Sequence, residues 1–117
     1  HDELLLLHNP ACSKSRATLA LLEERGEDFQ TRLYLEDPLD TSELAELARR
    51  LGRPAIEFTR SNEAVFRDAG LSARSPDAEI LAAMAAMPSL MERPILIRGL
   101  RAVVGRPPEG VLDLLDD

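Results

Sequence analysis

Residues 3–16 read ELLLLHNPACSKSR, and the change of pattern inside this stretch decides the fold. Glu3 to His8 is a short apolar run that ends at an Asn-Pro pair, which is typical of a buried strand rather than of a helix. Apolar residues at helical spacing then occur from Ser13 to Arg25, and Gly26 follows as a helix stop signal. The stretch therefore predicts a strand that passes directly into a helix.

A second strand is expected after this helix. Residues 29–35 alternate between apolar and polar side chains and end at Glu-Asp-Pro. The three elements form a β-α-β unit, whose crossover is expected to be right-handed and whose strands are expected to be parallel.

The middle of the chain has helical periodicity. Asp40 or Thr41 is suited to cap a helix that Gly52 ends. A shorter helix is expected over residues 62–69, and Ser75-Pro76 opens another that extends to Met87. These elements predict a helical insert over about residues 41–87.

The last part of the chain returns to strand patterns. Residues 94–98 form an apolar run, Gly99 turns the chain, and residues 102–104 continue as the partner strand of a hairpin. Pro107 and Pro108 are expected to start a final helix. The predicted fold class is therefore α/β: a thioredoxin-like β-α-β / β-β-α sheet with an inserted helical subdomain, forming a single domain over residues 1–117.

Composition excludes several classes of function. The formal net charge of −7 disfavours binding to nucleic acid, and the longest apolar run is too short to cross a membrane. No export signal opens the sequence, and a single cysteine cannot form an internal disulfide, so we expect a cytoplasmic protein. One cysteine and two distant histidines do not have the spacing of a metal site, so no metal is expected.

Cys12 is the first candidate functional residue. It lies where the strand gives way to the helix, so backbone N–H groups and the positive end of the helix dipole would favour its thiolate. The alternative is a buried structural thiol. Polar and basic neighbours favour a reactive thiol and a loop that holds an oxyanion; they are Asn9, Ser13, Lys14, Ser15 and Arg16.

Motifs spread along the chain carry a resemblance to a known family. They read HNPACSKSR (8–16), LYLEDP (33–38), RSNE (60–63), LMERPIL (90–96) and GRPPE (105–109). Together they resemble the thioredoxin-fold arsenate reductases that draw electrons from glutathione and glutaredoxin. The resemblance implies that Cys12 attacks arsenate and that three arginines, Arg60, Arg93 and Arg106, hold the oxyanion. It implies glutathione as co-substrate, glutaredoxin as partner and no bound cofactor.

The physical chemistry of arginine agrees with these roles. A guanidinium stays charged and donates several hydrogen bonds to a tetrahedral oxyanion, and its charge would also stabilise a thiolate. The alternative is that each arginine is an ordinary surface residue. Pro94 resembles the proline that thioredoxin folds keep in cis opposite the nucleophile, where its role is to shape the site.

The remaining loop residues have structural as well as functional interpretations. His8 either tunes Cys12 or is a hydrogen-bonded structural residue. Asn9 and Ser15 are expected to fix the loop and cap the helix, and Lys14 is either near the substrate or simply solvated. With Ser13 and Arg16, these residues make up the expected substrate-binding loop.

Two further functions remain open at this point. One is a related thiol oxidoreductase that acts on another oxyanion or on a glutathione adduct. The other is a regulator without enzymatic activity, since related thioredoxin-fold proteins contact RNA polymerase. Those regulators commonly carry a Cys-x-x-Cys switch, whereas this chain has Cys12-Ser13-Lys14-Ser15, which argues against that reading.

Overall fold

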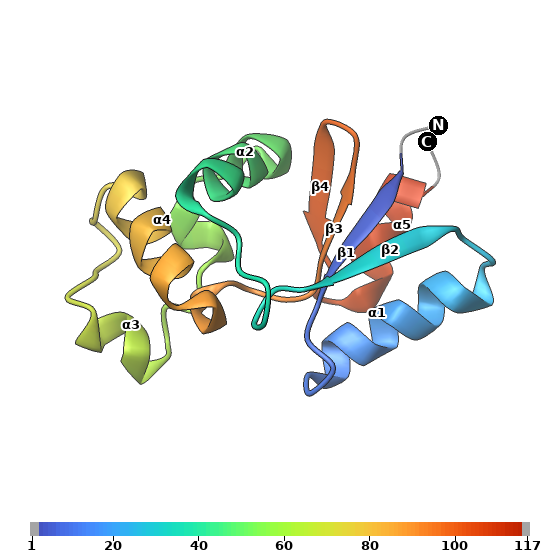
Figure 1. Ribbon diagram of the computed structural model, residues 1–117, viewed down its shortest axis with the longest axis horizontal. Coiled ribbons are helices and arrows are strands. Elements are labelled where there is room, and N and C mark those ends of the chain that lie inside the picture. Colours follow the sequence, from blue (N-terminus) through green and yellow to red (C-terminus); the bar gives the residue numbers. More distant parts are fainter. Residues whose placement is uncertain (1–2, 116–117) are drawn as a thin grey trace. The chain divides into compact units, whose positions relative to one another are not determined.

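A four-stranded mixed sheet organises one of two compact units in the computed structural model, which describes residues 3–115 (Figure 1). Its strands are β1 (Leu4–His8), β2 (Phe29–Leu33), β3 (Ile95–Arg98) and β4 (Arg101–Val104), in the order β2-β1-β3-β4. β1 is parallel to β2, whereas the β1–β3 and β3–β4 pairs are antiparallel. The predicted β-α-β unit and the hairpin around Gly99 are both confirmed.

Helices pack on this sheet through an apolar core. α1 (Ser13–Glu24) follows β1, and α5 (Leu112–Leu115) closes the described chain. Leu6 of β1, Leu22 of α1, Leu96 of β3 and Leu114 of α5 are fully buried in one cluster. The run of leucines in β1 reflects this central position, because a strand covered on both faces needs no polar residues.

The final helix differs in detail from the prediction. The segment after Pro107 begins as a 3-10 turn, η3 (Pro108–Val111), before the single α-helical turn of α5. Pro107 is the N-cap and Pro108 the first residue of this turn, positions at which a backbone N–H would have no intrahelical partner.

Residues Pro38–Glu92 form the second compact unit, which is entirely helical apart from an isolated bridge. It contains α2 (Thr41–Leu51), α3 (Ala64–Asp68) and α4 (Asp77–Ala86), and the short 3-10 turns η1 (Ala55–Phe58) and η2 (Pro88–Leu90). α2 packs against α4 through buried side chains that include Leu44, Leu47, Ile80 and Met84. The predicted helical insert is present, with a shorter α3 than expected, while the single-domain assignment stays a prediction.

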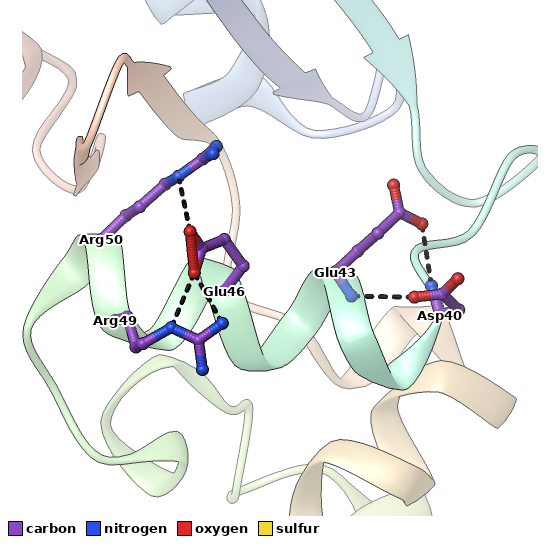
Figure 2. Close-up of polar contacts among 5 residues, drawn as sticks. All are labelled: Asp40, Glu43, Glu46, Arg49 and Arg50. Atoms are coloured by element: carbon purple, nitrogen blue, oxygen red, sulfur yellow. Dashed lines mark hydrogen bonds and ion pairs between the residues drawn. The ribbon is translucent and has the colours of Figure 1, made fainter.

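The ends of α2 follow from local sequence signals. The Asp40 carboxylate accepts a hydrogen bond from the Glu43 N–H at 2.8 Å, and the Glu43 carboxylate accepts one from the Asp40 N–H at 3.1 Å. Figure 2 shows this capping box and, one turn further on, Glu46 with Arg49 and Arg50. Gly52 ends the helix in the left-handed conformation that a glycine adopts without strain.

All helices in the described part of the chain are short. The longest among residues 3–115 is α1, with 12 residues. Within residues 3–115, no helix has the length and apolar character needed to cross a bilayer.

Candidate active site

The loop between β1 and α1 is fixed by its own hydrogen bonds. The Asn9 carbonyl accepts from the Cys12 N–H at 3.0 Å, and the Asn9 side-chain oxygen accepts from the Ala11 N–H at 3.0 Å. The Arg16 guanidinium donates to the Pro10 carbonyl at 2.8 Å. These bonds close a tight turn that presents Cys12 at the N-cap position of α1.

Ser15 is the hydrogen-bonding centre behind this loop. Its side chain is fully buried, and its Oγ accepts from the Asn9 N–H at 3.0 Å and lies 2.6 Å from His8 Nδ1. Burial, and secondarily the charge of Arg16, lowers the pKa of His8, which favours the neutral imidazole. In the neutral imidazole one ring nitrogen donates and the other accepts, so the tautomer decides which of Ser15 Oγ and His8 Nδ1 donates.

This arrangement corrects one expectation. Asn9 and Ser15 were expected to fix the loop and to cap the helix; they fix the loop, but the N-cap residue of α1 is Cys12. Ser15 lies inside the first turn, where its hydroxyl faces back toward β1 rather than toward the helix end. The thiol therefore occupies the place that a capping oxygen would take in an ordinary helix.

The Cys12 thiol is 8% exposed and has a lowered pKa. Burial acts in the opposite direction and raises the pKa, but it is outweighed by the backbone N–H of Ser15, the side chain of Arg93, the backbone N–H of Lys14 and the charge of Arg93. Hydrogen bonds from backbone N–H groups at the start of α1 and from the Arg93 side chain favour the charged thiolate over the neutral thiol. Cys12 is therefore a buried residue with a lowered thiol pKa, and its role as a reactive thiol stays a prediction.

Arg93 and Arg106 belong to the same compact unit as Cys12. Arg93 lies two residues before the start of β3, and its side chain lowers the pKa of the Cys12 thiol. Its Nε atom is buried and has no hydrogen-bond partner among residues 3–115. The exposed Arg106 donates to the Arg93 carbonyl at 3.3 Å, so the two arginine segments are in contact.

Both arginines are followed by cis-proline. The Arg93–Pro94 bond is cis, as predicted, and the Arg106–Pro107 bond is cis as well. Pro94 is buried, whereas Pro107 is exposed.

Arg60 lies in the helical unit, residues Pro38–Glu92. Its guanidinium pairs with the Glu63 carboxylate, and its Nε lies 3.8 Å from a Glu92 carboxylate oxygen. The backbone fixes these neighbours, since the Arg60 N–H donates to the Leu90 carbonyl at 2.7 Å. Glu63 belongs to the RSNE motif, but the sequence did not reveal that it pairs with Arg60. The predicted meeting of Arg60 with Cys12 stays a prediction.

The other loop residues lie at the surface. Ser13 and Lys14 are exposed in the first turn of α1, beside the exposed Arg16. Lys14 lowers the pKa of the Cys12 thiol through its backbone N–H rather than through its ammonium group. Within residues 3–115 there is no group of three or more His, Cys, Asp or Glu side chains suited to hold a metal ion.

Comparisons with known proteins identify a family and a fold. A model of the ArsC family matches residues 7–114. The chain is 42% identical to the uncharacterized protein YfgD of Escherichia coli K12, over 97% of each chain, and 39% identical to an arsenate reductase of Haemophilus influenzae, over 96% of this chain and 98% of the relative. An arsenate reductase structure from Vibrio cholerae superposes with a TM-score of 0.91 at 40% identity, covering 96% of this chain and 97% of the other. These likenesses confirm the predicted thioredoxin-like fold class.

Proposed function

The chain belongs to the ArsC family, and from this premise we propose that it reduces arsenate to arsenite with Cys12 as the nucleophile and with electrons from glutathione and glutaredoxin. The observation that carries the proposal is the lowered pKa of the Cys12 thiol, held at the start of α1 beside the Arg93 guanidinium. A nucleophile of this kind is active as a thiolate near neutral pH. Full-length relatives named arsenate reductase support arsenate as the substrate.

The proposed reaction starts on sulfur. The Cys12 thiolate attacks arsenic(V), and one hydroxyl group of arsenate leaves as water after taking up a proton, so a sulfur–arsenic bond replaces an oxygen–arsenic bond. Glutathione displaces a second hydroxyl group in the same way. A glutaredoxin thiol then attacks the glutathione sulfur, and the bond between that sulfur and arsenic breaks with its electron pair left on arsenic, which becomes arsenic(III) while still bonded to Cys12. Water finally releases arsenite and restores the Cys12 thiol.

The products of the electron transfer follow from this balance. The sulfur of glutathione ends in a mixed disulfide with glutaredoxin, and a further glutathione resolves it. Because this chain has a single cysteine, it cannot form an internal disulfide at any step. Two external thiols, those of glutathione and glutaredoxin, must therefore supply the two electrons.

Arg93 and Arg106 are the proposed anion ligands within the unit that carries Cys12. The buried Nε–H of Arg93, without a partner among the described residues, is a donor available to an oxyanion. Placing the anion beside the same guanidinium that stabilises the thiolate would bring the nucleophile and its target together. The exposed residues Ser13, Lys14 and Arg16 would border the entrance.

Arg60 is the third proposed anion ligand. Two carboxylates, those of Glu63 and Glu92, lie beside its guanidinium. An oxyanion would have to replace at least one of these carboxylates to bind Arg60, because like charges repel at short range. We therefore expect Arg60→Ala to weaken arsenate binding less than Arg93→Ala does.

The test is oxidation of glutathione that depends on arsenate, measured with glutaredoxin present. Cys12→Ser is expected to abolish it while the circular dichroism spectrum stays unchanged. Thr31→Ser, an exposed position on β2, is the matched control and should keep full activity. Turnover that survives in Cys12→Ser would overturn the covalent mechanism. Turnover in the wild type with another oxyanion but none with arsenate would overturn the substrate assignment.

A further inference from the structure

Gly105 occupies a position where no side chain fits. A Cβ atom added there would lie 2.9 Å from Pro94 Cγ and 3.0 Å from Thr18 Oγ1, closer than such atoms normally approach. The φ angle of Gly105 lies outside the left-handed region, so its backbone conformation would accept alanine. Space, rather than conformation, therefore requires glycine.

The neighbours of Gly105 cannot easily move away. Thr18 is fully buried, and its hydroxyl donates to the Lys14 carbonyl at 3.0 Å within α1. Pro94 is a rigid ring, buried, and its carbonyl accepts from the Gly105 N–H at 2.8 Å. A third contact, Val111 Cγ1 at 3.3 Å from the added atom, closes the remaining side. Buried, close-packed neighbours transmit a volume change instead of absorbing it.

The same contacts join the two parts of the thiol site. Thr18 lies on α1, the helix whose N-cap is Cys12. Pro94 follows Arg93, the residue whose side chain acts on the Cys12 sulfur. The Gly105 backbone therefore lies where the helix that carries the nucleophile meets the segment that carries the cation.

We propose that Gly105 is a positioning residue for the nucleophile: its missing side chain allows Pro94 and α1 to close together, and this packing holds the Arg93 guanidinium against the Cys12 sulfur. The inference concerns the thiol of the proposed function but does not depend on arsenate being the substrate. The experiment measures the thiol pKa without arsenate, so it can refute the role of Gly105 without bearing on arsenate reduction.

The measurement is the titration of the Cys12 thiolate by its ultraviolet absorbance, which is unambiguous because the chain has one cysteine. We expect Gly105→Ala to raise the thiol pKa toward the ordinary cysteine value, in the same direction as Arg93→Met, because the added methyl group displaces Pro94 and Arg93 with it. The double variant Gly105→Ala/Arg93→Met should titrate like Arg93→Met alone, since Gly105 acts through Arg93.

The matched control is Gly26→Ala, in the same compact unit at the far end of α1. Its φ of 68° makes alanine strained, but no atom lies within 4 Å of the added methyl group. This variant is expected to lose stability and to keep the wild-type thiol pKa, which separates general destabilisation from repositioning.

The outcomes are decisive in either direction. A folded Gly105→Ala with the wild-type thiol pKa would overturn the proposal, and so would a pKa shift that adds fully to that of Arg93→Met. If Gly105→Ala does not fold, Thr18→Ile adds a carbon to the same contact from the α1 side, and it should raise the thiol pKa in the same direction. An unchanged pKa in folded Thr18→Ile would overturn the proposal as well.

Discussion

The hydroxyl of Ser15 offers the sharpest stability test of the loop, and Ser15→Ala is the change that removes it. Ser15 Oγ lies 2.6 Å from His8 Nδ1 and accepts from the Asn9 N–H at 3.0 Å, in a side chain with no solvent exposure. Alanine keeps the backbone and has a higher helix propensity than serine, so the loss of stability comes from these two hydrogen bonds alone and is partly offset by the gain in propensity. Both partners then lose the oxygen that satisfies them.

The magnitude follows from the burial of the partners. An unsatisfied buried polar group costs about 1–3 kcal/mol, which applies to the buried ring of His8. The N–H of Asn9 is only partly buried, so losing its bond costs about 0.5–1.5 kcal/mol. We therefore expect Ser15→Ala to lower the free energy of unfolding by roughly 2–4 kcal/mol.

The assay is urea unfolding followed by circular dichroism at neutral pH, with Ser13→Ala as the matched control. Ser13 is exposed in the same helical turn, so its removal should change the free energy of unfolding by no more than about 0.5 kcal/mol. Equal small losses in both variants would refute the reasoning, because the buried hydroxyl would then not hold the loop.

Four other changes test separate parts of the molecule. Arg93→Lys keeps the charge but loses the planar fork, and steady-state kinetics should show kcat falling by roughly 10–100-fold if arsenate is the substrate. His8→Asn should remove a loss of stability on acidification. Because the folded-state pKa of His8 is lowered, wild-type stability is full above about pH 6.5 and falls as the pH drops through the folded-state pKa. Urea titrations at several pH values would reveal this fall in the wild type and its absence in His8→Asn. Arg98→Met removes the donor to the Leu114 carbonyl at 2.9 Å and should destabilise the protein by about 1.5–3 kcal/mol in thermal unfolding. Asp40→Ala breaks the capping box of α2 and should lower the free energy of unfolding by about 1 kcal/mol, measured by the same method. If Arg98→Met or Asp40→Ala is as stable as the wild type, the role assigned to that residue is contradicted.

Most of the fold was predictable because its signals are local. The Asn-Pro pair after β1, the Asp40 and Gly52 ends of α2 and the turn at Gly99 are each encoded within a few residues, and the structure agrees with them. The turns η1 and η2 were missed because three or four residues are too short to show a hydrophobic period.

The candidate site was predictable only where a motif carried it. The placement of Cys12 at the start of α1 follows from the order of strand and helix, and Arg93 was identified by its motif. Ser15 was expected to fix the loop, but its contact with the buried His8 was not visible, because that contact depends on how the loop brings residues 8, 9 and 15 together. The close approach at Gly105 was hidden for the same reason, since it joins segments far apart in the chain.

The rate at which iodoacetamide alkylates Cys12, followed across pH in the wild type and in Arg93→Met, tests most directly whether the helix start and the guanidinium hold the sulfur ionised. We predict that the wild-type rate reaches half its maximum at a pH below that of an unperturbed cysteine peptide, and that Arg93→Met moves this midpoint upward. A wild-type midpoint at or above that of the peptide, with no change in Arg93→Met, would contradict the assignment of Cys12 as an activated nucleophile.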